Sequence, residues 1–270
     1  MKNNHIIESQ QEEDRQEFEC CWTAPLPVLT LSSNEIHVWC ADLDLPAYRI
    51  QQLAQNLSPD ERERADRFHF DRHRRRFTVA RGFLRSILGR YLPIDPDQLE
   101  FSYSEHGKPT LAPASPDETL CFNLSHSHEM ALYAVTHNRS IGIDIEHIRS
   151  NRDVEQLAKR YFSPREYEVI SSLHPDQRQE GFYNGWTRKE AYLKATGEGL
   201  AGLEEVEVSL APGKPAALLS IKENRQEAGR WSVCHLTPPV KGYAAALAVK
   251  GSSDHRACFF ISKETAPDFL

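Results

Sequence analysis

Two acidic residues interrupt an apolar run near the middle of the chain. Residues 142–146 read GIDIE, so Asp144 and Glu146 stand two positions apart. In a β-strand, positions i and i+2 face the same side, which puts both carboxylates on one face while Ile143 and Ile145 turn to the other. Carboxylates held this close repel one another unless a proton or a cation lies between them. Two acids at this spacing, taken alone, more often mark a solvated strand face, so their interpretation depends on the residues that lie beside them.

A third acid lies further along in a helical segment, where residues 186–194 read WTRKEAYLK. On an α-helix, positions i, i+3, i+4 and i+8 form one stripe, here Trp186, Lys189, Glu190 and Lys194. The tryptophan indicates a partly buried stripe, whereas the simpler alternative is an exposed Glu–Lys pair. If Glu190 meets the strand pair, three carboxylates form an all-oxygen site that suits Mg²⁺ or Mn²⁺. The two lysines beside it could then hold phosphate oxygens.

Charge is distributed unevenly along the 270 residues. The formal total is −7, yet residues 61–90 hold ten arginines against four acids, which is a local charge of +6. A basic segment in an acidic protein indicates a small anionic ligand, and the acidic total argues against a nucleic-acid binder. No apolar run is long enough to cross a bilayer, so no membrane partner is expected.

The N-terminal residues resemble no signal peptide and are rich in Glu and Gln. We therefore expect a cytoplasmic protein whose residues 1–20 form a solvated tail. Its six cysteines fit neither a disulfide framework nor a metal-binding knuckle, so reduced thiols are expected.

Strand and helix signals alternate along the chain, which predicts an α/β (α+β) fold. The expected strands are 35–43, 130–137, 140–146, 206–210, 230–236 and 243–249, and the expected helices are 59–70, 72–91, 153–161, 164–173 and 177–196.

A shift of 105 residues brings landmarks of the two halves into register. Ser58-Pro59 falls on Ser163-Pro164, and Glu61 falls on Glu166. Ser-Pro-x-Glu begins a helix, because the serine caps it, the proline fits its first turn and the glutamate meets the positive end of its dipole. We predict two similar halves related by a pseudo-twofold axis, with a ligand cleft between them. They are an arginine-rich half, 21–138, and an acid-bearing half, 139–250, followed by a C-terminal extension, 251–270, without an assigned role.

Four blocks of the sequence, in their order and spacing, resemble the signatures of the 4′-phosphopantetheinyl transferases. They are His106-Gly-Lys108-Pro109, Phe122-Asn-Leu-Ser125-His126-Ser, Gly142-Ile-Asp144-Ile-Glu146 and Trp186-Thr-Arg-Lys189-Glu190-Ala-Tyr-Leu-Lys194. The length is similar to that of the pseudo-dimeric, surfactin-synthetase-activating (Sfp-like) type, so a monomer is expected. The resemblance implies transfer of phosphopantetheine from coenzyme A to a serine of an apo carrier protein, with release of 3′,5′-ADP. Attack at a pyrophosphate phosphorus needs a metal ion, further positive charges and a base.

The resemblance also implies roles for individual residues. Asp144, Glu146 and Glu190 correspond to the Mg²⁺ ligands, and Glu190 is also the candidate base for the serine. Lys194 corresponds to the lysine that holds the pyrophosphate. Coenzyme A contacts are expected from Arg64, Arg76, Lys108, Pro109, Ser125, His126, Lys189 and Lys194. Glu61 stands where the family has a basic residue, which leaves the outer phosphate contact open.

Two other functions fit part of the pattern. A magnesium-dependent phosphohydrolase could use the same three acids, but it would not need the GKP or FNLSHS blocks. A non-catalytic module that binds coenzyme A or a carrier protein would be expected to have lost an acid or Lys194, and all are present. Fatty-acid, polyketide and nonribosomal-peptide carriers stay open as substrates.

Overall fold

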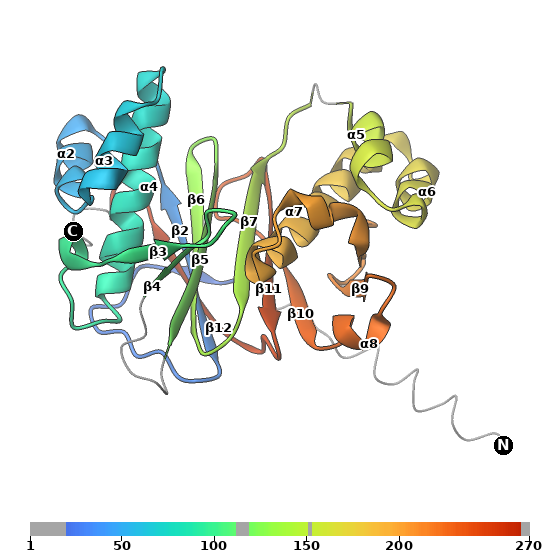
Figure 1. The fold of residues 1–270 in the computed structure, drawn as a ribbon. Coiled ribbons are helices and arrows are strands. Elements are labelled where there is room, and N and C mark those ends of the chain that lie inside the picture. Colours follow the sequence, from blue (N-terminus) through green and yellow to red (C-terminus); the bar gives the residue numbers. More distant parts are fainter. Residues whose placement is uncertain (1–19, 112–118, 151–152, 266–270) are drawn as a thin grey trace.

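Strands occupy the centre of the molecule and helices flank them on two sides. The computed structural model describes residues 20–111, 119–150 and 153–265. Helices α2, α3 and α4 lie on one side of the strands, and α5, α6 and α7 lie on the other (Figure 1). The α/β fold predicted from the sequence is confirmed. Among the described residues, none of the helices combines the length and the apolar composition that crossing a bilayer demands.

One sheet has five strands in the order β1-β12-β2-β6-β5. Strand β12 runs parallel to β1 and β2, whereas β6 runs antiparallel to β2 and β5. The bounds are β1 Trp22–Thr23, β2 Glu35–Asp42, β5 Leu120–Ser127, β6 Met130–His137 and β12 His255–Ile261. The segment 251–270, to which the sequence assigned no role, therefore supplies an inner strand of this sheet. Its Phe259 lies opposite Trp39, with ring centroids 4.5 Å apart.

The helices of the first half cover one face of this sheet. They are α2 Ala47–Gln55, α3 Pro59–Asp66, α4 Asp71–Gly89 and the short 3₁₀-helix η1 Pro96–Gln98. A hairpin of β3 Phe101–Tyr103 and β4 Pro109–Leu111 follows. Alternation along β2 turns Trp39 and Ala41 toward the helices, where they pack with Phe83 and Ile87 of α4.

The second half contains a three-stranded antiparallel sheet in the order β10-β11-β7. Its elements are β7 Ile141–His147, α5 Val154–Tyr161, α6 Pro164–Ser172, α7 Pro175–Thr196, η2 Leu200–Glu205, β8 Val206–Val208, β9 Leu218–Ile221, α8 Arg225–Ala228, β10 Trp231–Leu236 and β11 Tyr243–Lys250. Helix α7 packs across β7 and β11, and the small side chains of Ala246 and Ala248 permit this close approach.

The two halves repeat the same order of elements, as the 105-residue shift predicts. In each, a strand (β2 or β7) leads through a short helix to a Ser-Pro-capped helix (α3 or α6) and then to a long helix (α4 or α7). The strand orders also correspond, β2-β6-β5 in one half and β7-β11-β10 in the other. In both capped helices the glutamate accepts a hydrogen bond from the serine backbone, Glu61 from Ser58 at 3.1 Å and Glu166 from Ser163 at 2.9 Å.

An apolar core joins the two halves. Ile36, Val38 and Cys40 point away from the helices of their own half and pack against Ile143 and Ile145 of β7. These isoleucines form the side of β7 opposite to Asp144 and Glu146, as strand alternation predicts. The burial of one side of β7 between the sheets therefore aims its acids at the other side.

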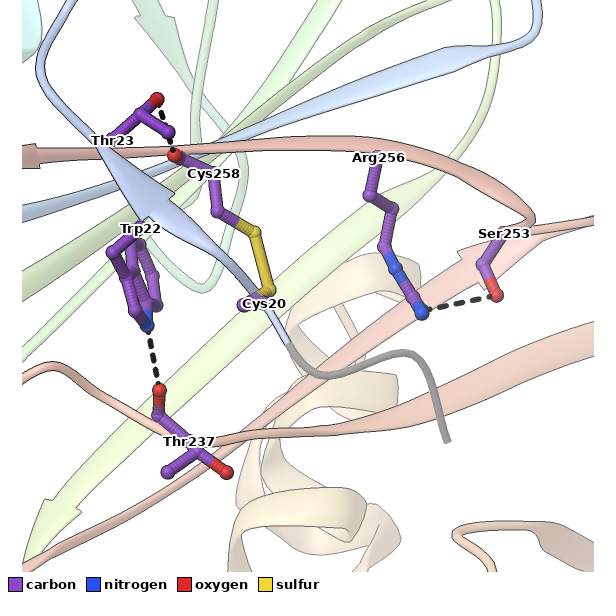
Figure 2. Close-up of a disulfide and its surroundings, with 7 residues drawn as sticks. All are labelled: Cys20, Trp22, Thr23, Thr237, Ser253, Arg256 and Cys258. Atoms are coloured by element: carbon purple, nitrogen blue, oxygen red, sulfur yellow. Dashed lines mark hydrogen bonds between the residues drawn. A yellow bond between two sulfur atoms is a disulfide. The ribbon is translucent and has the colours of Figure 1, made fainter. Parts of the chain in front are cut away.

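The structure corrects the expectation that all cysteines are reduced. Cys20 and Cys258 form a disulfide, with their Cα atoms 5.8 Å apart (Figure 2). The parallel pairing of β1 with β12 sets Trp22 opposite Cys258 and so brings Cys20 near. The two cysteines are 238 residues apart in the sequence, so their proximity could not be predicted from it. The predicted tail, apart from Cys20, lies outside the described residues.

Candidate active site

A cavity of about 540 Å³ lies where the two halves meet. It is bounded by α3 and α4, by the β3–β4 hairpin, by β5 and by the C-terminal part of α7. The lining residues are Arg64, Phe68, Phe77, Ala80, Arg81, Tyr103, His106, Gly107, Lys108, Pro109, Asn123, Leu124, Ser125, His126, Glu190, Leu193, Lys194, Gly197 and Gly199. Four of these are arginine or lysine and one is acidic, so the cavity suits an anion.

Strand β5, the FNLSHS block, ties the cavity wall to the acids of β7. Its alternate side chains Asn123, Ser125 and Ser127 face the β7 backbone and accept hydrogen bonds from the N–H groups of residues 143, 145 and 147, at 2.9, 3.4 and 3.1 Å. Hydrogen bonds from the β7 backbone to side chains of β5 thus join the two sheets, in place of the backbone–backbone hydrogen bonds of a continuous sheet. The sequence did not predict this strand, because its polar face looks like a loop until β7 supplies partners for it.

Asp144 contacts two residues of the cavity wall, Ser125 and Lys194, and is itself only 3% exposed. Its Oδ1 accepts hydrogen bonds from Ser125 Oγ at 2.9 Å and Lys194 Nζ at 2.6 Å. Its Oδ2 is buried without a hydrogen-bond partner. Glu146, two residues on, accepts from Ser127 Oγ at 3.0 Å. A buried carboxylate oxygen without a donor is costly in a folded protein, and a cation would satisfy it.

Glu190 joins the two strand acids from α7. Burial, and next the negative charge of Asp144, raise the pKa of Glu190 to about 7, while Lys194 opposes this shift. Glu146 adds a smaller repulsion. The three predicted metal ligands therefore act on one another electrostatically, and their oxygens match the preference of Mg²⁺. Within the described residues, however, no three His, Cys, Asp or Glu side chains are close enough to form a preassembled metal site. The Lys194 ammonium instead sits against Asp144.

Lys189 does not lie with Glu190 and Lys194, contrary to the single stripe predicted for this helix. It is fully buried, contacts Glu166 at 2.5 Å and donates to Leu203 O at 2.7 Å. Successive helical residues point about 100° apart, which turns Lys189 into the core of the second half while Glu190 reaches the cavity. The structure thus gives no support to a phosphate contact from Lys189. Trp186 packs on the aromatic ring of Phe182, as a core anchor would.

Of the other predicted coenzyme A contacts, Arg64 and His126 line the cavity, whereas Arg76 does not. Arg64 lines it and lies over the ring of Phe77, at 5.5 Å from the centroid. Arg76 is set back and pairs with Glu129 at 3.2 Å. The pKa of His126 is lowered, first by desolvation and then by Lys194, with smaller effects of both arginines. The His126 side chain itself is exposed.

Lys108 and Pro109 also line the cavity, but the lysine has unexpected partners. Its Nζ donates to Ala195 O at 2.9 Å and to Ile141 O at 3.3 Å, both in the second half. Burial lowers the pKa of Lys108 to about 8. Lys108 therefore ties the β3–β4 hairpin to the end of α7 and the start of β7.

Glu61, the position at which the outer phosphate contact was left open, has a structural role. It is 2% exposed, and its two oxygens are bound by Arg81 Nε at 2.5 Å and Arg85 Nε at 2.6 Å. Arg81 also lines the cavity and donates to Tyr103 OH at 2.9 Å. Arg81 is thus a cavity residue that was not predicted from the sequence. The i, i+4 spacing of Arg81 and Arg85 opposite a capping glutamate was the available signal.

Comparison with known proteins defines the family. Residues 140–248 match the family model described as the 4′-phosphopantetheinyl transferase superfamily, and residues 46–138 match the one described as 4′-phosphopantetheinyl transferase, N-terminal. The chain is 50% identical over 230 residues to the 4′-phosphopantetheinyl transferase HetI of Nostoc sp. (strain PCC 7120 / SAG 25.82 / UTEX 2576), an alignment that covers 85% of this chain and 94% of that protein.

Two more distant relatives extend the comparison. The 4′-phosphopantetheinyl transferase Sfp of Bacillus subtilis (strain 168) is 34% identical over 145 residues, which is 54% of this chain and 62% of Sfp. A solved apo-ACPS structure from Chronobacterium ammoiniagenes aligns with 42% of this chain and 98% of its own, at 22% identity and a TM-score of 0.30. On the family models and the extensive match to HetI, the chain belongs to the 4′-phosphopantetheinyl transferase superfamily, and its two-half organisation is that of the Sfp-like type.

Proposed function

We propose that this chain, a 4′-phosphopantetheinyl transferase, moves phosphopantetheine from coenzyme A to a serine of an apo carrier protein through the cavity between its halves. The observation that carries this proposal is the convergence of Arg64, Arg81 and Lys194 with Glu190 in one cavity, next to Asp144. Cations that hold phosphate oxygens and an acid that can accept a proton are what attack at phosphorus requires.

The chain's own residues divide the work. Arg64, His126 and Lys194 would hold the phosphates of coenzyme A, and the hairpin around Lys108 and Pro109 would lie along its nucleotide end. The serine oxygen would attack the phosphorus attached to pantetheine, and the bond to the departing 3′,5′-ADP would break. Glu190, a carboxylate on the cavity wall, would take the serine proton.

Asp144, Glu146 and Glu190 would hold Mg²⁺, with Mn²⁺ as an alternative of the same ligand preference. The unpartnered Asp144 Oδ2 and the crowding of three acids fit a divalent cation. Bound there, the cation would supply charge neutralisation at the pyrophosphate. We expect Mg²⁺ to raise the unfolding temperature of the wild type and to leave that of Asp144→Asn unchanged.

We also propose that the protein works as a monomer, since one chain already forms the cavity from both halves. We place the boundary between the halves between residues 138 and 139, and the protein in the cytoplasm. Neither a nucleic acid nor a membrane is a partner in this proposal.

Intact-mass measurement of an apo carrier protein tests the transfer directly. Incubation with the protein, coenzyme A and Mg²⁺ should add one phosphopantetheine group to the carrier, and Asp144→Asn should abolish the gain. A matched control is Asp176→Asn, because the Asp176 side chain is 88% exposed and lies at the start of α7. Absence of transfer to fatty-acid, polyketide and peptide carriers alike would refute the proposal, and coenzyme A binding without transfer would favour a non-catalytic binding module.

A further inference from the structure

An exposed aromatic and basic segment, residues 67–72 with the sequence RFHFDR, comprises the connection between α3 and α4 and the first two residues of α4, and is called the 67–72 turn below. Phe68 and Phe70 are 38% and 55% exposed. The Arg72 guanidinium lies over the Phe70 ring, 5.5 Å from its centroid. Two exposed phenylalanines only two positions apart are unusual on a surface that contacts only water, and aromatic side chains next to arginine are typical of protein interfaces.

The positive charge of this turn is only partly compensated. Asp71 pairs with Arg74 and Arg75 of the following helical turn. Arg67 has a long, exposed contact of 3.7 Å with Glu63. Among the residues that the structure describes, Arg72 has no carboxylate partner, and its side chain is exposed. The turn therefore presents an apolar surface with available positive charge.

The turn stands beside the cavity. Phe68 itself lines the cavity. Further along α4, Arg76 pairs with Glu129 in the turn between β5 and β6, and Ser127 at that turn donates to Glu146. The start of α4, the β5–β6 turn and the end of β7 accordingly lie at the same end of the molecule, which is the upper end in Figure 1.

We propose that the 67–72 turn is part of the docking surface for the apo carrier protein and favours carriers with acidic and apolar side chains around the acceptor serine. This inference rests on the proposed function. A serine that reaches the phosphorus inside the cavity brings the carrier surface around it over the cavity mouth. Acidic groups there would meet Arg67 and Arg72, and an apolar side chain would pack on Phe70, in the manner of aromatic and arginine anchors at interfaces.

The test uses Phe70→Ser and Arg72→Glu, since neither residue lines the cavity. With an acidic apo acyl carrier protein as the varied substrate, each change should raise the KM for the carrier about tenfold. The KM for coenzyme A and the rate at saturating carrier should stay at the wild-type values. Added salt should raise the carrier KM of the wild type more than that of Arg72→Glu.

Two control variants match the chemistry at other places. Tyr48 on α2 is 57% exposed and lies beneath Arg49 at 4.9 Å, so Tyr48→Ser removes a similar aromatic–arginine pair away from the cavity. Arg225→Glu makes the same charge reversal on the exposed start of α8. Both should leave the carrier KM unchanged, and thermal unfolding of all four variants should match the wild type.

Binding of a fluorescent apo carrier, measured without coenzyme A, separates this inference from the proposed function. Weaker binding by Phe70→Ser and Arg72→Glu supports the docking surface even if no group is transferred. Wild-type binding and KM in both variants would overturn it, and so would an equal loss in the Tyr48 and Arg225 controls. Failure of the wild-type protein to bind any carrier would also overturn it.

Discussion

Strand β7 and helix α7 approach each other closely at Gly142, and replacing this glycine with alanine perturbs the site without changing a reactive group. A Cβ at this position would lie 2.0 Å from Ala191 O, 2.4 Å from Ala195 N and 3.0 Å from Ala195 Cα. All three are main-chain atoms of α7, so no side-chain rotation relieves the clash. The glycine of the GIDIE motif is thus required by packing.

The geometry sets the size of the effect. Cβ atoms essentially never approach other atoms within 3.0 Å, so α7 must withdraw by about 1 Å (3.0 minus 2.0). Overpacking costs about 1–3 kcal/mol, and we expect the upper end because the obstacle is backbone. The same withdrawal separates Glu190 and Lys194 from Asp144, where the lysine contact is now 2.6 Å. Misplacement of reactive groups by about 1 Å lowers the rate about 100-fold.

Denaturant unfolding and intact-mass transfer rates measure the two effects on one preparation of Gly142→Ala. Gly229→Ala is the control, because its Cβ would meet nothing nearer than Gln226 O at 3.5 Å and its backbone angle φ is −64°. A Gly142→Ala protein within about 0.5 kcal/mol of the wild type and within twofold of its rate would refute the reasoning.

Three further predictions concern stability. In urea titrations, Glu61→Gln should lower the free energy of unfolding by about 3–5 kcal/mol, because two buried arginines lose their counter-charge. The control Glu63→Gln, on the exposed side of the same helix, should lower it by less than about 0.5 kcal/mol. Asn123→Ala should cost about 1–3 kcal/mol by the same assay, because the buried N–H of Ile143 loses its acceptor; a neutral result would contradict the role of β5 side chains as the link to β7. The pKa of Lys108 is about 8 in the folded protein and 10.5 in the unfolded chain, so between these pH values the unfolded chain binds more protons. The wild type should therefore gain stability relative to Lys108→Met as the pH rises from 8 to 10.5, by at most about 1.4 kcal/mol per pH unit. Parallel stability–pH profiles of the two proteins would count against a buried Lys108 amine.

The fold was readable from the sequence where local signals and burial agree. The capped helices begin at Pro59 and Pro164 because Ser-Pro-x-Glu satisfies their first N–H groups locally. Strand β7 was evident because its isoleucines alternate with acids. By contrast, β12 and β5 were missed. The first is an apolar run whose place beside β2 depends on residues more than 200 positions away, and the polar face of the second is explained only by its hydrogen bonds to β7.

The sequence by itself determined which residues could do the chemistry: the acids Asp144, Glu146 and Glu190, and the cations that accompany them. Tertiary structure decided which of the charged neighbours face the cavity. Lys189 fits the family motif and Glu61 departs from it, yet both form buried ion pairs in the core, while Arg81, which lies outside the four sequence blocks, reaches the cavity. The physical reason is that the direction of a side chain on a helix is set by the surface against which the helix packs, and only the assembled halves define that surface.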